Sequence, residues 1–107
     1  MANNYLLLYR GGSMPANEAE QAQVMAAWDK WFHQIGTALV DGGNPFTPMA
    51  KVVDHHGTVS NLPQDMMMSG YSVIKADSLD EAVAMAKNCP VTLGGADIAV
   101  FETFNVM

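Results

Sequence analysis

The sequence predicts an α+β protein of the ferredoxin-like type, a sandwich in which an antiparallel sheet carries two helices on one face. Apolar runs of strand length and two stretches of helical period follow one another in the order β-α-β-β-α-β, with an extra hairpin after the second strand. Both helical stretches begin with a capping box. The length of 107 residues, half of them apolar, suits a single domain, residues 1–107, with one core.

The first half of the chain is expected to form a strand, a long helix and a second strand. Residues 5–9, YLLLY, are a compact apolar run between polar residues and glycines, which is typical of a buried strand. A helix is expected from Glu18 to Ile35, because Asn17 begins a capping box and apolar residues then recur at helical spacing. Gly36 suits the end of this helix, and residues 37–40, TALV, favour a strand.

A hairpin is expected next. Residues 51–54 and 58–60 are short strand candidates on either side of the turn His55-His56-Gly57. Residues 61–69 have no clear period and are expected to form a packed loop.

The chain closes with a strand, a helix and a last strand. Residues 70–76, GYSVIKA, are expected to form the strand. Ser78 and Glu81 then form the second capping box, at the start of a helix from Leu79 to Lys87. The last strand is expected at residues 98–104, IAVFETF.

The predicted sheet is apolar on both faces. The runs at residues 5–9 and 98–104 place apolar side chains at successive positions, and two helices can cover only one face of a sheet. A second copy of the chain is the simplest cover, since a two-fold axis presents the same face to itself. The sequence therefore predicts a homodimer.

Composition restricts the other partners and the location. The net charge of -6 disfavours nucleic acid and anionic membrane surfaces as partners. The beginning, MANNYLLLYRGG, has neither a basic n-region nor a span-length apolar run, so no signal peptide and no membrane span are expected. Cys89 is the single cysteine, which excludes an internal disulfide and fits a reducing compartment. A cytoplasmic protein is expected.

The stretch VDGGNPF at residues 40–46 is the best candidate site. Asp41 follows an apolar run, where its carboxylate either caps a turn through Gly43 or lines a pocket as a base or acceptor. Gly42 and Gly43 allow a ligand to approach the backbone, and a strand bulge explains them as well. Asn44 adds a donor and an acceptor beside Asp41.

Two basic residues extend this candidate site. Arg10 leaves the end of the first strand, where it either binds a carboxylate ligand or pairs with Asp41. His33 lies one turn before the end of the first helix, where the helix dipole favours a cation without any catalytic role. Proton transfer by His33 requires a partner within hydrogen-bond reach.

Other motifs give no cofactor or metal. Asp54 and His56 both suit zinc, but with no third ligand at a recognisable spacing the segment is interpreted as an exposed hairpin turn. Trp28, Trp31 and Phe32, together with nine methionines, describe either core packing or an adaptable apolar ligand cavity.

The chain resembles the YCII-related family, including its DGPF-type branch. The resemblance rests on five stretches in a constant order, which together span nearly the whole chain. They are YLLLYRGG at 5–12, the helix with Trp28, Trp31 and Phe32, LVDGGNPF at 39–46, residues 70–90, and IAVFET at 98–103.

The resemblance implies a dimeric α+β barrel built from a single YCII-related domain. Some relatives are cofactor-independent enzymes with a histidine and an aspartate near the end of the first helix and the following strand. On this basis His33 and Asp41 are the catalytic candidates, and Gln34 stands where a carboxylate would follow the histidine. Arg10, Gly42, Gly43 and Asn44 are the ligand-binding candidates.

The function expected is the binding of a small organic molecule by a homodimer. Cofactor-independent acid-base chemistry, such as isomerisation or elimination, is one form of this function. A non-catalytic binding or protein-interaction module is the alternative, and the residues leave open which of the two applies.

Overall fold

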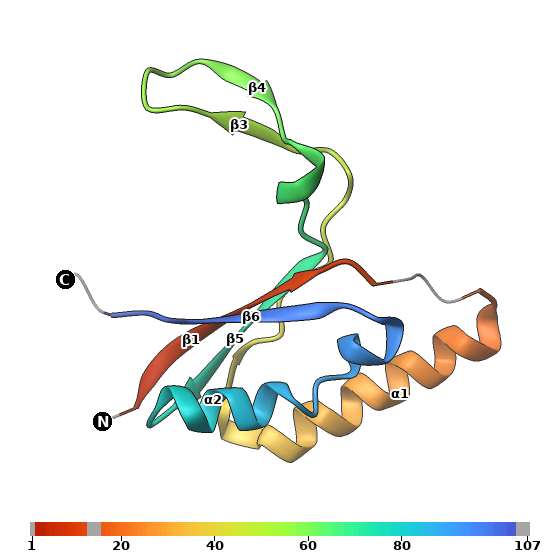
Figure 1. The fold of residues 1–107 in the computed structure, drawn as a ribbon. Coiled ribbons are helices and arrows are strands. Elements are labelled where there is room, and N and C mark those ends of the chain that lie inside the picture. Colours follow the sequence, from red (N-terminus) through yellow and green to blue (C-terminus); the bar gives the residue numbers. More distant parts are fainter. Residues whose placement is uncertain (1, 13–15, 105–107) are drawn as a thin grey trace.

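The computed structural model describes residues 2–12 and 16–104, and Figure 1 shows a sheet with its helices on one side and a hairpin on the other. The sheet has four antiparallel strands in the order β2-β5-β1-β6. Helices α1 and α2 follow β1 and β5, which confirms the predicted ferredoxin-like fold. The bounds are β1 Asn3–Arg10, α1 Glu18–Ile35, β2 Leu39–Asp41, β5 Gly70–Ala76, α2 Leu79–Ala86 and β6 Asp97–Glu102.

The hairpin between β2 and β5 forms a separate two-stranded sheet. Its strands are β3, Lys51–Val53, and β4, Val59–Asn61, and they pair antiparallel. We call residues 46–69, which contain this hairpin and both of its connections, the arm. Figure 1 shows that the arm projects from the sheet on the side away from α1 and α2. The extra hairpin expected from the sequence is thus confirmed.

The expected helix starts are confirmed, and some element ends differ. Asn17 Oδ1 accepts from the Glu20 amide at 2.9 Å, and Ser78 Oγ accepts from the Glu81 amide at 3.1 Å. Residues expected as strand or loop form three short 3₁₀ helices instead: η1 Gly36–Ala38, η2 Gln64–Met66 and η3 Pro90–Gly94. The last strand runs from Asp97 to Glu102, and the backbone amide and hydroxyl of Thr103 then both donate to the Asn4 carbonyl.

The core lies between the sheet and the two helices. Trp31 of α1 is 1% exposed, and its indole N–H donates to the Met85 carbonyl at 3.0 Å. Trp28 packs edge-on against both Tyr9 and Trp31. The aromatic residues of α1 are therefore core, which decides between the two interpretations of that cluster.

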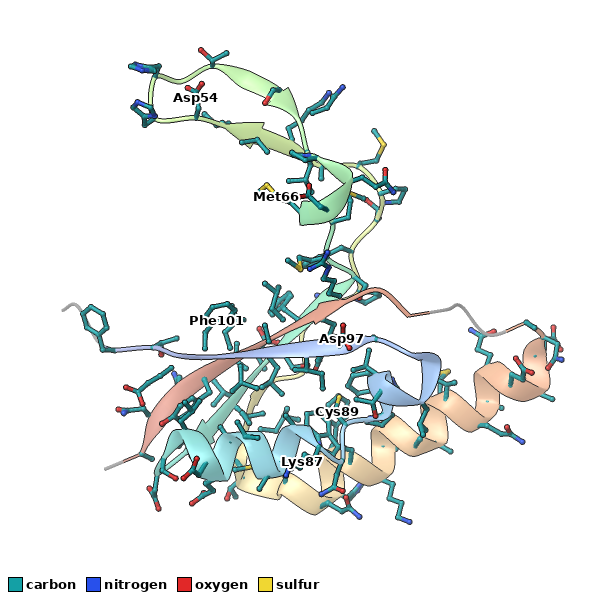
Figure 2. The ribbon with its side chains drawn as sticks, in the orientation of Figure 1. Asp54, Met66, Lys87, Cys89, Asp97 and Phe101 are labelled. Atoms are coloured by element: carbon teal, nitrogen blue, oxygen red, sulfur yellow. The ribbon has the colours of Figure 1, made fainter. Side chains whose placement is uncertain are left out.

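The opposite face of the sheet carries apolar side chains that no helix covers. Strand residues alternate between faces, and Leu6 lies opposite both Val73 and Phe101 in the pairing register. Figure 2 shows Phe101 on the side of the arm and Cys89 on the side of the helices. We call this surface the open face; it consists of Leu6, Leu8, Tyr71, Val73, Ala99 and Phe101.

A chain of hydrogen bonds crosses the core and reaches the connection after β2. The Cys89 thiol lies 3.6 Å from the Tyr9 hydroxyl, which donates to Ser72 Oγ at 2.8 Å. Ser72 in turn donates to the Gly42 carbonyl at 2.7 Å. Burial raises the pKa of Tyr9 and of Cys89 above their ordinary values, so both groups stay neutral donors.

We expect Ser72→Ala to lower the free energy of unfolding by about 1 to 3 kcal/mol, because the buried Tyr9 hydroxyl then lacks an acceptor. Tyr9→Phe removes that donor, so the double variant is expected to be more stable than the sum of the two single losses implies. Urea unfolding of the four proteins measures this coupling. Losses that add to within about 0.5 kcal/mol would contradict it.

Candidate functional site

Asp41 ends β2 and closes a tight turn with its side chain. Its Oδ1 accepts from the Gly43 amide at 2.8 Å, so the capping role expected from the sequence is confirmed. Its Oδ2 lies 3.5 Å from the hydroxyl of Tyr71. That separation is longer than an ordinary hydroxyl–carboxylate hydrogen bond. One carboxylate oxygen therefore holds the turn, and the other faces a weakly engaged phenol.

Gly43 lies very close to the backbone of β5. A Cβ there would lie 1.7 Å from the Tyr71 carbonyl oxygen, and the backbone has φ +74°. At Gly42 a Cβ would lie 3.3 Å from the ring of Phe32. The pairing of β2 with β5 also shifts register between Leu39 and Asp41. What approaches the glycines is thus the chain's own strand and helix, which is the bulge interpretation.

An aromatic pair continues the site along β5. Pro45 bridges to Gly70, and the Phe46 amide donates to the Ser69 carbonyl at 2.8 Å, so the connection after β2 runs beside the start of β5. This places the ring of Phe46 on that of Tyr71, stacked at 5.8 Å between centroids. Asp41, Tyr71 and Phe46 therefore form a continuous line from a carboxylate to an apolar surface.

An apolar pocket of about 440 Å³ begins at Phe46. It lies where the arm joins the sheet, and Figure 2 shows Met66 at that end of the arm. Thioether side chains adapt to irregular ligands, and a few polar groups at one end are the usual plan of a small-molecule site. The lining residues include Phe46, Met49, Leu62, Met66, Met67 and Met68.

Two other predicted site residues, His33 and Arg10, lie on other elements than Asp41, Tyr71 and Phe46. His33 is exposed on α1, and its Nδ1 lies 2.7 Å from the Asp29 carbonyl of the same helix. Arg10 is exposed at the end of β1, in register with Asp97. Within residues 2–12 and 16–104, neither His33 nor Arg10 forms an ion pair with Asp41.

Asn44 is exposed, directly after the two glycines. Its carbonyl oxygen would lie 3.1 Å from a Cβ at Gly70, so its backbone packs on the start of β5. Asp41, Gly42, Gly43 and Asn44 are thus brought together, whereas His33 is not joined to them.

Tyr71, beside Asp41, was not predicted from the sequence. Phe46 ends the candidate stretch VDGGNPF, and an apolar cavity was one of the two interpretations of the methionines, which include the run Met66 to Met68. Tyr71 alternates with the buried Ser72, and this alternation is the signal that places it on the open face. In the Met run and at Phe46 there is no period to read, because both lie in connections. Stacking on Tyr71 brings Phe46 toward Asp41, and the Met run lines the pocket that begins at Phe46.

The part of the chain that the structure describes contains neither a cluster of metal-ligating side chains nor a membrane-spanning helix. No group of three or more His, Cys, Asp and Glu side chains there could hold a metal ion. At the tip of the arm Asp54 Oδ1 accepts from the amides of His56 and Thr58, which is the expected hairpin turn. None of the described helices combines the length and apolarity needed to cross a bilayer.

Comparison with solved structures shows similarity at the level of the fold. No protein-family model and no curated protein matches the sequence. The chain is similar to the solved structure of 5-chloro-2-hydroxyhydroquinone dehydrochlorinase (TftG) from Burkholderia phenoliruptrix AC1100, in complex with 2,5-dihydroxybenzoquinone. The match has a TM-score of 0.53 and 19% sequence identity, and covers 94% of this chain and 93% of the dehydrochlorinase. This similarity establishes a shared fold.

We expect Gly43→Ala to destabilise the protein by about 3 to 5 kcal/mol, because its Cβ meets the Tyr71 carbonyl in a left-handed backbone. Gly57→Ala is the matched control. Gly57 has φ +85° with no atom within 4 Å of the added Cβ, so strain alone should cost about 1 to 2 kcal/mol. Thermal unfolding of both variants measures the difference. Equal losses of stability in the two variants would show that the close approach to β5 adds nothing to the cost of the backbone strain.

Proposed function

We propose that this chain is a cytoplasmic homodimer of the YCII-related type that binds a small organic molecule beside Asp41 and Tyr71. The carboxylate and the phenol form the polar end of the site, and the methionine-lined pocket forms its apolar end. The observation that carries the proposal is the line Asp41, Tyr71, Phe46, which joins an acid to that pocket.

The surface area of the single chain supports the homodimer. The chain exposes 7777 Å², whereas a compact monomer of this mass exposes about 5,800 Å². Its radius of gyration is 15.3 Å, against about 13 Å for a compact chain of this length. The excess of accessible surface area over a compact monomer is comparable to the area that one subunit buries in an obligate dimer. The open face and the arm are where this surface lies.

The chemistry of the site favours a flat ring with hydroxyl or oxo groups. Phe46 and Tyr71 offer stacked aromatic surface, while Asp41 Oδ2 accepts and the Tyr71 hydroxyl donates. The similar dehydrochlorinase was solved with 2,5-dihydroxybenzoquinone, a molecule of this class. Binding of a phenol or quinone by this chain is part of the proposal.

Acid-base catalysis would use Asp41 as the proton acceptor. Its Oδ2 is free of backbone bonds and faces the Tyr71 hydroxyl, so it can take a proton from a ring hydroxyl, or from an adjacent carbon, of a ligand bound beside Tyr71. Since His33 makes its hydrogen bond inside α1, the proposal assigns proton transfer to Asp41 and not to a histidine–aspartate pair.

A non-catalytic binding module is the second candidate. One observation favours it: Asp41 Oδ1 is already engaged by the Gly43 amide, as in a purely structural turn. In that case the same site would bind without turnover, and incubation with 2,5-dihydroxybenzoquinone would leave the compound unchanged.

For the homodimer, we expect light scattering at micromolar concentration to give twice the chain mass of 11.5 kDa. Phe101→Lys, on the open face, should shift the protein toward the monomer, because it places a charge in the apolar interface. Met25→Lys on α1 is the matched control and should leave the dimer intact, since Met25 is similarly exposed, 62% against 51%. A wild-type mass of one chain would contradict the proposal.

For the site, we expect Asp41→Asn to weaken binding of 2,5-dihydroxybenzoquinone by about 10- to 100-fold, the loss of a hydrogen bond to a charged group. Asparagine still accepts from the Gly43 amide, so the melting temperature should change little. Asp54→Asn makes the same change in the turn of the arm and should leave affinity unaltered. Unchanged affinity in Asp41→Asn, with or without a loss of about 0.5 to 2 kcal/mol of stability, would confine Asp41 to the turn. Calorimetric titration and thermal unfolding give both values.

A further inference from the structure

The arm is a well-formed element that its own chain leaves uncovered. β3 and β4 pair only with each other, and a two-stranded hairpin alone is marginally stable in water. Its cross-strand pair, Val53 and Val59, is 65% and 59% exposed, and Met49 is 86% exposed. Apolar side chains of this exposure, together on one hairpin, indicate a surface that another molecule covers.

The arm is nevertheless held firmly where it leaves the sheet. The Phe46 amide donates to the Ser69 carbonyl at 2.8 Å, and the Ser69 amide donates to the Tyr9 carbonyl at 2.7 Å. Both connections of the arm are therefore tied to each other and to β1. At its tip, the Asp54 amide donates to the Thr58 carbonyl at 2.9 Å. A preorganised arm loses less conformational entropy on binding than a mobile loop does.

The arm and the open face lie on the same side of the sheet (Figure 1). A two-fold axis that brings two open faces together therefore also brings the arm of each copy alongside the other copy. Charge agrees with this arrangement. The arm carries Lys51 against Asp54 and Asp65, a net charge of -1, out of -6 for the whole chain. A nearly neutral arm meets less repulsion on an acidic partner than a second acidic surface would.

We propose that the arm is a clasp exchanged between two copies of this chain. Val53 and Val59 of each arm pack on the body of the other copy, and that copy closes the open side of the methionine-lined pocket at the base of the arm. The site for the small molecule is then complete only in the dimer. This inference rests on the homodimer proposed above and adds the element that holds it together.

The first experiment replaces Val53 and Val59 together by lysine. Both side chains are largely exposed in the single chain, so its own fold should tolerate the change. The dimer dissociation constant is expected to rise at least about tenfold by analytical ultracentrifugation, as apolar contacts to the partner are lost. Met25→Lys is the control and should leave the constant unchanged. A double variant that is folded by circular dichroism and dimerises as tightly as wild type would overturn the clasp.

The second experiment tests the contact without any substitution. Isotopically labelled and unlabelled chains are mixed, and filtered nuclear Overhauser spectra record only contacts between copies. Signals from the Val53 and Val59 methyl groups to the partner are expected. A dimer that gives signals between open faces but none from these methyl groups overturns the clasp and leaves the homodimer standing. A monomer overturns both.

Discussion

The contact between the Gly43 backbone and the carbonyl of Tyr71 is the constraint on which the rest of the site depends. With no room for a Cβ, β2 lies directly against β5, and the chain that follows must run along the start of β5. In this arrangement the Asp41 carboxylate lies 3.5 Å from the Tyr71 hydroxyl, and the ring of Phe46 stacks on that of Tyr71. The two ends of the arm, Phe46 and Ser69, therefore leave the sheet side by side. A single close approach thus sets the geometry of the carboxylate, the pocket and the arm.

The two faces of the sheet have different roles. On the helix side, Trp31 and the residues around it form a closed core, and the Tyr9–Ser72 hydroxyl pair anchors the Gly42 carbonyl from within. Because buried polar groups need fixed partners, these hydrogen bonds fix the Gly42 backbone of the candidate site on its core side. On the other side, an apolar surface and an uncovered arm remain. The proposed dimer interface and the proposed small-molecule site both lie on that uncovered side of the sheet.

The candidate site was predictable where a residue's local chemistry decides its position. An aspartate followed by two glycines at a strand end indicates a turn, and Asp41 forms that turn. The choice of His33 and Asp41 as catalytic candidates was an expectation from resemblance. In the structure the His33 ring bonds within its own helix, because an exposed helical histidine reaches the carbonyl four residues earlier more readily than another element. Tyr71 could not be found, since its contacts with Asp41 and Phe46 depend on which connection lies beside β5.

The sequence by itself determined the element order, the caps at Asn17 and Ser78, and hence the ferredoxin-like arrangement. These features follow from short-range periodicity and backbone bonding within a few residues. Tertiary structure alone decided that the aromatic residues of α1 are core and that Met49 and the run Met66 to Met68 line one pocket. It also decided that Asp41 faces a phenol. The Asp41–Tyr71 contact joins residues 30 positions apart, and only strand register and packing select such a contact.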